Sequence, residues 1–351
     1  MSLLEHAQTA TDRYFMMLAI EQAQRGQYTA RPNPAVGCVI VQADVVVGQG
    51  FHPKVGQPHA EVFALDDAGS KSNSATAYVT LEPCSHTGRT PPCALALIKA
   101  GIKRVVIAGL DPNPQVAGRG VSLLQQAGIE VTVGIMTEQA EALNRGFLKA
   151  MRTQLPYVRL KIATSLDGRT AMASGESKWI TSAAAREDVQ QLRAQSAAII
   201  TGSSTVIADN PQLNVRSTRL GFALEDIPAP KIVILDRRER LAHDVHSDYH
   251  LCRHTDSLYW RDDNLPKLLA TLVSDYQCYD ILVEAGASVA GSFLSQQLVD
   301  ELIVYQAPCL LGVQARAMVD FNPLALAQQL RFQYAHQQRV GNDLKLTLLP
   351  L

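Results

Sequence analysis

One histidine, two cysteines and one glutamate occur in an order that can support metal chemistry. His59 and Glu61 are separated by one alanine at the expected start of a helix, and Cys84 and Cys93 each follow a proline. A neutral imidazole and two thiolates suit Zn²⁺, with the fourth coordination position left for water. Cysteines near helix N-termini have lowered pKa values, which favours the thiolate that a metal needs. Glu61 would then move a proton between this water and a leaving amine.

The order of these residues is more specific than any one of them. With nine histidines, one H-x-E triplet arises by chance, and Pro308–Cys309 is a further Pro-Cys pair with no ligand nearby. H-x-E followed by P-C and a second cysteine is, however, the pattern of zinc deaminases. Eight residues separate the two cysteines here, where the pattern has two. A structural zinc site with His86 as its fourth ligand is the alternative.

Alternating strands and helices surround these residues in the first half of the chain. Helical spacing of apolar residues predicts a first helix from Asp12 to Gly26, and further helices are expected near His59 and Cys93. Short apolar runs predict four strands, at 37–41, 45–50, 75–80 and 105–108. This alternation indicates an α/β domain with parallel strand pairing.

The alternation restarts after a polar, basic stretch from Leu148 to Pro156, where we place a domain boundary. A chain of 351 residues has the length of two domains, and we assign 1–147 to the first and 157–351 to the second. In the second half, a helix is predicted over 184–194, and strands are predicted at 158–163, 197–201, 231–236 and 281–284. A Gly-containing loop, 285–291, then leads into a helical run. The backbone amides of this loop could bind an anion. The alternative is that its glycines are needed only for the backbone conformation of a tight turn.

The overall composition argues against several classes of protein. Lys plus Arg number 32 and Asp plus Glu 33, so the chain lacks the basic surplus of proteins that coat nucleic acid. An apolar share of 47% argues against disorder. We find no signal peptide and no run near the ~20 apolar residues of a membrane span. The six cysteines are too few for a disulfide framework. We therefore expect a cytoplasmic protein.

Longer motifs around the metal residues resemble those of the riboflavin-biosynthesis deaminase–reductase family. They are Pro32 to Gly37, His52, Gly56 to Glu61, Thr80 to Cys93 with its long cysteine spacing, and Asp111 to Gly120. The resemblance runs over both halves of the chain. It implies an N-terminal cytidine-deaminase-like α/β/α domain and a C-terminal dihydrofolate-reductase-like α/β domain, with Zn²⁺ and NADPH as cofactors.

The resemblance implies two successive reactions on one small phosphorylated substrate. The first is hydrolytic deamination of a diaminopyrimidine that carries a phosphoribosylamino group, with Glu61 as the catalytic residue. The second is NADPH-dependent reduction of the ribosyl side chain to ribityl. In the first domain the substrate would contact Asn33, His52, His86 and Arg89. The last two would meet the phosphate. From the residues alone, Asn33 fits a turn equally well. Arg89 fits a solvated loop charge, and only the resemblance favours a ligand role for it.

The resemblance also implies sites in the second domain. Cofactor contacts are expected from Ala163, Trp179, Thr205, Asp209, Gly286, Ala287, Ser288, Val289, Ala290, Gly291 and Ser292. Substrate contacts are expected from Ser177, Arg193, Leu213, Arg216 and Glu284. The two arginines suit the phosphate, although Arg193 also fits an exposed helix face. Lys161 and Asp209 are both candidates for the proton donor. Arg237, directly after a strand, is expected at the 2′-phosphate of NADPH.

Two other functions fit parts of the sequence. A nucleic-acid-editing zinc deaminase with an appended binding domain would need a basic surplus and stacking aromatic residues, and only 6% of this chain is aromatic. A non-catalytic zinc regulatory protein would need a closed metal site. We expect the biosynthetic enzyme instead. It would act as a homo-oligomer, with a dimer favoured, on a small-molecule partner and without nucleic-acid or membrane partners.

Overall fold

The computed structural model describes residues 3–85, 92–113, 116–241, 247–254 and 256–351, and of residues 3–8 it describes the backbone alone. Contacts divide the chain into two units, Met1–Thr153 and Gln154–Leu351. The division falls inside the polar stretch where we placed the boundary. The first part of that stretch is the end of a helix, α6 (Arg145–Thr153), which belongs to the first unit and buries Leu148 and Ala150.

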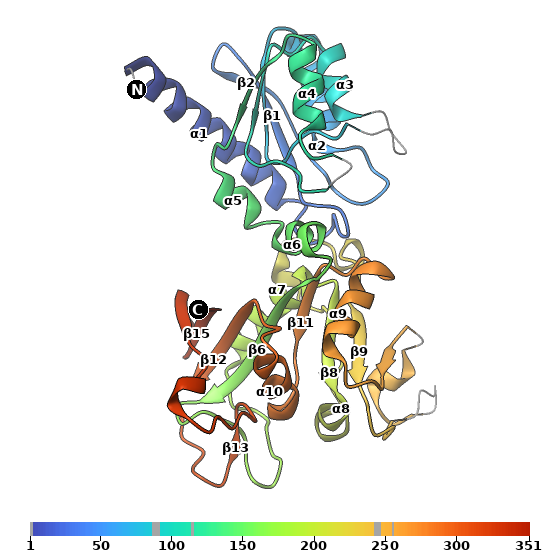
Figure 1. Cartoon of the computed structure of the whole chain (residues 1–351), viewed down its shortest axis with the longest axis vertical. Coiled ribbons are helices and arrows are strands. Elements are labelled where there is room, and N and C mark those ends of the chain that lie inside the picture. The colour runs from blue at the N-terminus through green and yellow to red at the C-terminus, as the bar shows by residue number, and fades with distance from the viewer. Residues whose placement is uncertain (1–2, 86–91, 114–115, 242–246, 255) are drawn as a thin grey trace. The chain divides into compact units, whose positions relative to one another are not determined.

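Within the described residues, the first unit contains a five-stranded sheet with helices on both faces (Figure 1). The strand order is β2–β1–β3–β4–β5, with β1 antiparallel to both neighbours and the other pairs parallel. The strands are β1 (Gly37–Gln42), β2 (Val45–Phe51), β3 (Thr76–Val79), β4 (Arg104–Ile107) and β5 (Glu130–Val133). The other helices are α1 (Leu3–Gln24), α2 (Ala60–Ala68), η1 (Gly69–Ser72), α3 (Cys93–Lys99), α4 (Arg119–Gln126) and α5 (Thr137–Glu141).

Alternating side chains of β1 supply two cores, one on each face of the sheet. Cys38 and Ile40 pack with α2, α3 and α4, and Val39 and Val41 pack with α1. The prediction that the first helix begins at Asp12 was wrong, because α1 begins at Leu3. The Asp12 carboxylate is buried and accepts hydrogen bonds from the Arg104 guanidinium and the Tyr78 hydroxyl, so it joins helix to sheet rather than capping the helix.

In the part of the second unit that the structure describes, an eight-stranded sheet has the order β10–β9–β8–β11–β6–β12–β15–β14. Figure 1 labels its strands from β15 through β12, β6, β11 and β8 to β9. Its pairs are parallel from β10 to β12, and β15 and β14 add an antiparallel hairpin. The first strands are β6 (Tyr157–Ser165), β8 (Ala198–Gly202), β9 (Lys231–Leu235) and β10 (Leu258–Trp260). The later strands are β11 (Asp280–Val283), β12 (Glu301–Ala307), β14 (Phe332–Val340) and β15 (Asp343–Pro350). A separate pair consists of β7 (Arg169–Ala171) and β13 (Arg316–Ala317).

Helices cover both faces of the large sheet. They are α7 (Ala183–Gln195), α8 (Ser203–Asp209), α9 (Leu265–Ser274) and α10 (Ala287–Ser295), with short turns η2 (Thr218–Leu220), η3 (Leu224–Asp226), η4 (His250–Arg253) and η5 (Leu326–Gln328). Neighbouring residues of β8 divide between the two cores. Ile199 packs with α7 and α8, and Ile200 packs with α9 and α10. None of the helices in the described part of the chain is long and apolar enough to cross a membrane.

Candidate active sites

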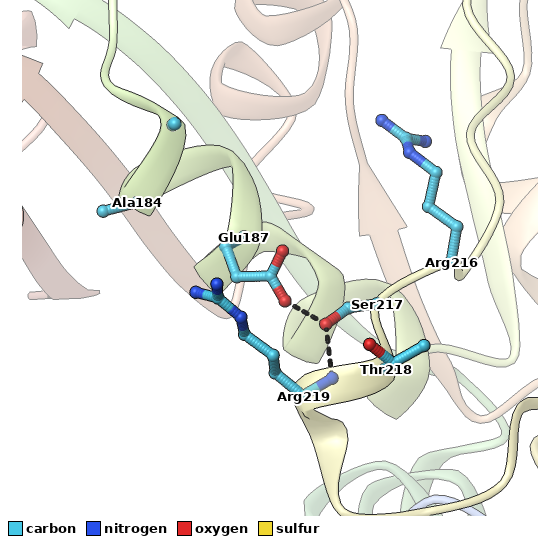
Figure 2. Close-up of a pocket in the computed structure, with 7 residues that line it drawn as sticks. Ala184, Glu187, Arg216, Ser217, Thr218 and Arg219 are labelled. Atoms are coloured by element: carbon cyan, nitrogen blue, oxygen red, sulfur yellow. Dashed lines mark hydrogen bonds between the residues drawn. The ribbon is translucent and has the colours of Figure 1, made fainter.

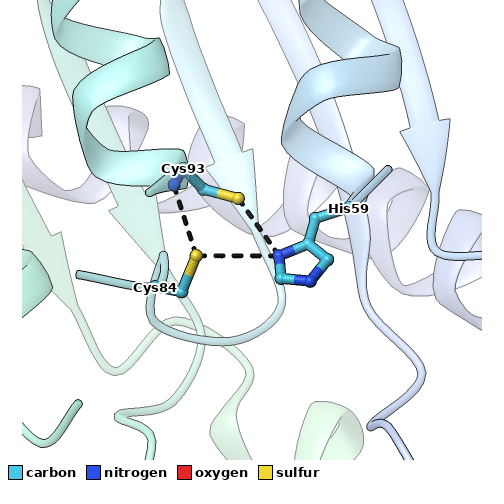
Figure 3. Close-up of side chains that lie close together, drawn as sticks. All are labelled: His59, Cys84 and Cys93. Atoms are coloured by element: carbon cyan, nitrogen blue, oxygen red, sulfur yellow. Dashed lines mark hydrogen bonds between the residues drawn. The ribbon is translucent and has the colours of Figure 1, made fainter. Parts of the chain in front are cut away.

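His59, Cys84 and Cys93 come together at one end of the first sheet (Figure 3). His59 is the N-cap of α2, Cys93 is the first residue of α3, and Cys84 follows β3. His59 Nδ1 lies 3.2 Å from Cys93 Sγ and 3.6 Å from Cys84 Sγ. All three donor atoms lie within 4.8 Å of one another. Two ligands of a tetrahedral zinc ion are about 3.6 Å apart, so this donor set fits Zn²⁺.

The protonation of the three donor groups also fits a metal site. Hydrogen bonds from Cys93 and His59 lower the pKa of the Cys84 thiol to about 4. The hydrogen bond to Cys84 and burial raise the pKa of Cys93 well above its ordinary value. A hydrogen bond to Cys84 raises the pKa of His59. The two sulfur atoms and the imidazole nitrogen thus share protons through hydrogen bonds. A divalent cation bound by the same lone pairs would replace those protons.

Glu61 lies in the first turn of α2 and is 3% exposed. Burial and the nearby Cys84 raise the pKa of its carboxyl group to about 7. A carboxyl group with such a pKa can both accept and release a proton near neutral pH. Glu61 interacts with Cys84, His59 and Cys93, and its acid–base role stays a prediction.

His52 and Asn33 lie beside this donor set. The His52 ring meets the His59 ring edge-on, with centroids 5.3 Å apart. His52 Nδ1 donates to the Pro58 carbonyl over 3.1 Å, which leaves Nε2 to accept from Asn33 Nδ2 over 3.0 Å. Burial lowers the pKa of His52, which favours this neutral form. Asn33 is therefore held by a side-chain hydrogen bond.

Two predicted substrate residues of the first unit, His86 and Arg89, lie outside the described residues. Glu82, two residues before Cys84, was not among the predicted site residues. Its carboxylate is 4% exposed and accepts four backbone hydrogen bonds. The donors are the amides of Asp111 at 3.3 Å, Gly118 at 3.0 Å, Gly120 at 2.9 Å and Val121 at 3.2 Å.

The segment held by Glu82 packs directly against the residue before Cys84. A Cβ atom at Gly120 would lie 2.2 Å from the carbonyl oxygen of Pro83, so only glycine fits there. One signal for this contact is present in the sequence, namely an acidic residue in front of Pro83–Cys84 and a Gly-containing motif after the next strand. The sequence does not show that the acidic residue and the Gly-containing motif are in contact.

The second unit has a buried cluster of charges at the end of β11. Arg193 of α7 binds both carboxylate oxygens of Glu284, with Nε–Oε1 at 2.7 Å and Nη2–Oε2 at 3.1 Å. Lys161 of β6 lies 3.6 Å from the same carboxylate. Burial raises the pKa of Glu284, but Arg193 and Lys161 outweigh it and lower the pKa to about 2. Arg193 is thus a buried ion-pair partner, and its alternative interpretation as an exposed helix charge was wrong.

Arg216 lies near this cluster and borders a hollow of about 380 Å³ at the start of α7 (Figure 2). Its pKa is lowered by burial and by the positive charge of Arg193. Its side chain is exposed, and its Nη1 donates to Asn214 Oδ1 at 2.9 Å. On the other side of the hollow, Ser217 donates a hydrogen bond to Glu187. Arg216 is thus more accessible to a phosphate than Arg193.

Several of the predicted cofactor residues lie on α8 and α10. The amide of Gly286 donates to Thr205 Oγ1 at 3.2 Å, and Ser177 Oγ donates to Asp209 Oδ1 at 2.8 Å. Trp179 is 70% exposed, and the Arg186 guanidinium lies 4.1 Å from the centre of its ring. Of the other predicted residues, Ala163 lies on β6 and the substrate candidate Leu213 is buried.

The predicted loop 285–291 is shorter than expected. Gly286 is the N-cap of α10, so the helix includes Ala287 onward. Ala290 is fully buried, and a Cβ atom at Gly291 would lie 2.0 Å from the Asp320 carbonyl, so Gly291 serves packing. The first amides of a helix have no partner within the helix, so those in the first turn of α10 suit the pyrophosphate of a dinucleotide.

Arg237, which we expect at the 2′-phosphate, pairs with an aspartate. Its Nη1 lies 2.9 Å from both carboxylate oxygens of Asp263, and both side chains are largely exposed.

The three-layer unit, with its His-Cys-Cys site beside Glu61, fits a zinc-dependent deaminase, and it is joined to a second α/β unit with a site of its own. The family described as "Cytidine and deoxycytidylate deaminase zinc-binding region" matches residues 9–109. The family described as "RibD C-terminal domain" matches residues 156–346.

Three relatives are similar over almost the whole chain. The riboflavin biosynthesis protein RibD of Escherichia coli is 49% identical over 96% of this chain and 99% of its own. The structure of Acinetobacter baumannii RibD has 53% identity and a TM-score of 0.93, covering 98% of this chain and 99% of its own. A diaminohydroxyphosphoribosylaminopyrimidine deaminase and phosphoribosylaminouracil reductase from Thermotoga maritima is 30% identical, with a TM-score of 0.88, over 98% of this chain and 100% of its own.

The chain belongs to the RibD family of riboflavin biosynthesis proteins. It is a deaminase and reductase whose cofactors are zinc and NADPH, as the sequence predicts. This membership supports the biosynthetic enzyme over the nucleic-acid-editing deaminase.

Proposed function

We propose that the first unit deaminates a diaminopyrimidine carrying a phosphoribosylamino group. We also propose that the second unit reduces the ribosyl side chain of the product to ribityl. One observation carries the proposal: His59, Cys84 and Cys93 meet beside the buried carboxyl group of Glu61. The name of the Thermotoga maritima relative contains both activities on this type of substrate.

In the deaminase site, His59, Cys84 and Cys93 would hold the zinc. When bound, zinc supplies a Lewis acid that makes water nucleophilic near neutral pH. Glu61 takes a proton from the attacking water and returns it to the amine that leaves as ammonia. The amide of Asn33, fixed by its hydrogen bond to His52, orients the pyrimidine ring. His86 and Arg89 bind the phosphate in this proposal.

In the reductase site, NADPH supplies the hydride, and the chain positions the two reactants. The amides in the first turn of α10, which follows Gly286, hold the cofactor, with Thr205, Asp209, Trp179 and Ala163 along it. The side chains of Ser177, Leu213 and Glu284 contact the substrate. Arg216 binds the phosphate, because its guanidinium is exposed. Arg193 acts by holding Glu284, which occupies its Nε and Nη2.

For the proton donor of the reduction we favour Lys161 over Asp209. Lys161 carries protons on Nζ and lies 3.6 Å from the carboxylate of Glu284, at the centre of the charged cluster. Asp209 already accepts a hydrogen bond from Ser177 over 2.8 Å, so that oxygen acts as an acceptor.

We also propose that the enzyme is a cytoplasmic homo-oligomer, with a dimer favoured, and that it has no nucleic-acid partner. All six cysteines are free, which suits a reducing compartment. The edge strand β14 has an exposed row of residues, including Tyr334 at 69%, and a second subunit would cover such an edge. Light scattering during size-exclusion chromatography would give the mass, and a monomer would contradict this part of the proposal.

The variant Glu61→Gln tests the deaminase assignment. The glutamine amide has the shape of the Glu61 carboxyl group but cannot carry a proton from the water to the leaving amine. We therefore expect zinc content to stay at the wild-type level and ammonia release to fall at least about 100-fold. Glu138→Gln makes the same chemical change at an exposed position and should match the wild type. Wild-type ammonia release by Glu61→Gln would refute the catalytic role. Loss of zinc would show a structural role instead.

A further inference from the structure

Arg240 is a charged residue that the proposed reactions do not use, although its side chain is held in a defined place. Its Nη2 donates to Ser203 Oγ at 2.8 Å and to Ser204 Oγ at 2.7 Å. A hydroxyl group accepts and donates at the same time, so each serine keeps its own O–H donor. One exposed guanidinium and two hydroxyl groups therefore converge as hydrogen-bond donors.

Hydrogen bonds to a buried carboxylate fix the backbone at Arg240. Asp236 is fully buried, and its carboxylate accepts from the amide of Arg240 at 3.1 Å and from the amide of Leu241 at 2.9 Å. The turn after β9 thus presents Arg240 toward α8 before any ligand binds. Such preorganisation lowers the entropy cost of binding.

The position of this group relative to the proposed cofactor site follows from the sheet. Strands β9, β8 and β11 are parallel neighbours, so their carboxyl ends lie along one edge. Ser203 follows β8, Arg240 follows β9, and Gly286 follows β11. The hydrogen bond from Gly286 to Thr205 joins the start of α10 to α8. A dinucleotide with its pyrophosphate at the start of α10 would extend its adenosine half across β8 toward β9.

We propose that Arg240, Ser203 and Ser204 bind the 2′-phosphate of NADPH and set the preference for NADPH over NADH. The inference rests on the proposed cofactor site. Arginine and hydroxyl donors are suited to a phosphate dianion, and NADH has only a hydroxyl group at this position. Arg237 is a weaker candidate because its guanidinium is paired with Asp263.

Calorimetric titration of the whole enzyme with 2′,5′-ADP and with 5′-ADP tests the proposal without turnover. For Arg240→Ala we expect the affinity for 2′,5′-ADP to fall at least about tenfold, and that for 5′-ADP to change less than about twofold. Arg238→Ala removes the same charge from an exposed neighbour and should behave as the wild type. If Arg240→Ala does not fold, as judged by circular dichroism, Arg240→Gln gives the same comparison.

The outcomes separate this inference from the proposed function. If the wild type prefers 2′,5′-ADP and the Arg240 variant keeps that preference, the inference is overturned while the cofactor site stands. Loss of the preference in Arg237→Ala instead would assign the 2′-phosphate to the other arginine. If the wild type binds neither 2′,5′-ADP nor NADPH, both the inference and the proposed cofactor site fail.

Discussion

The buried carboxylate of Glu82 gives the sharpest prediction about the deaminase unit. Oε1 accepts hydrogen bonds from the amides of Gly120 and Val121. Oε2 accepts hydrogen bonds from the amides of Gly118 and Asp111. In Glu82→Gln, one of these oxygens becomes an NH₂ group that faces two N–H donors. Two hydrogen bonds to a charged acceptor are then lost, each contributing about 1.5–3 kcal/mol. We expect the first unit to lose roughly 3–6 kcal/mol of unfolding free energy.

The consequence should reach the metal site, because Cys84 is two residues from Glu82. The segment that the carboxylate holds packs on Pro83, and its release frees the backbone that carries the Cys84 thiolate. We therefore expect zinc to pass from Glu82→Gln to a chromogenic chelator at least about tenfold faster than from the wild type. Glu82→Asp keeps the charge and should restore part of the difference.

Two assays measure these effects separately. Denaturant unfolding followed by circular dichroism gives the stability of the first unit, and absorbance of the chelator gives the rate of zinc release. Glu130→Gln is the matched control, because that side chain is 68% exposed and makes an ion pair with Arg104. NADPH binding by the second unit should not change. If Glu82→Gln releases zinc at the wild-type rate while its stability falls, Glu82 stabilises the fold without positioning Cys84, and this reasoning is refuted.

The remaining predictions concern the zinc ligands and the buried ion pair. Cys93→Ser should reduce bound zinc to below about a tenth of the wild-type content, because it removes one of three ligands, whereas Cys309→Ser should keep it; elemental analysis of the dialysed proteins decides. The folded-state pKa of Glu284, about 2, lies below its ordinary value of 4.5, so its ion pair stabilises the second unit above pH 4.5 and loses this contribution between pH 4.5 and 2. In Glu284→Gln the thermal midpoint of that unit should fall less steeply over this range; an unchanged slope would contradict the assignment.

Much of the first site could be predicted from the sequence because its residues occupy element ends. His59 and Cys93 begin helices, and the apolar run before Cys84 predicts a strand, so the topology brings them to one edge of the sheet. Glu82 was missed because its partners are 29 to 39 residues away and are backbone amides. No pattern of side chains in the sequence records such a contact.

The second unit shows where the pattern of residues fails. The strand β14 was not predicted because it is an edge strand whose residues are mostly exposed, so it lacks the apolar alternation of a half-buried strand. In the sequence, Arg193 cannot be told from an arginine on the surface. Only its pairing with Glu284 in the structure shows that it is buried. The choice between Arg237 and Arg240 likewise depends on Asp263 and Ser203, which are distant in sequence.

A two-signal assay of the purified enzyme tests the central claim most directly. With the phosphoribosyl diaminopyrimidine and NADPH present, one molecule of ammonia should be released for each NADPH oxidised, and ammonia should appear first. With Glu61→Gln both signals should disappear, and addition of the deaminated pyrimidine should restore NADPH oxidation alone. Oxidation of NADPH by Glu61→Gln without prior deamination, or ammonia release by the wild type with no NADPH oxidation, would contradict the account.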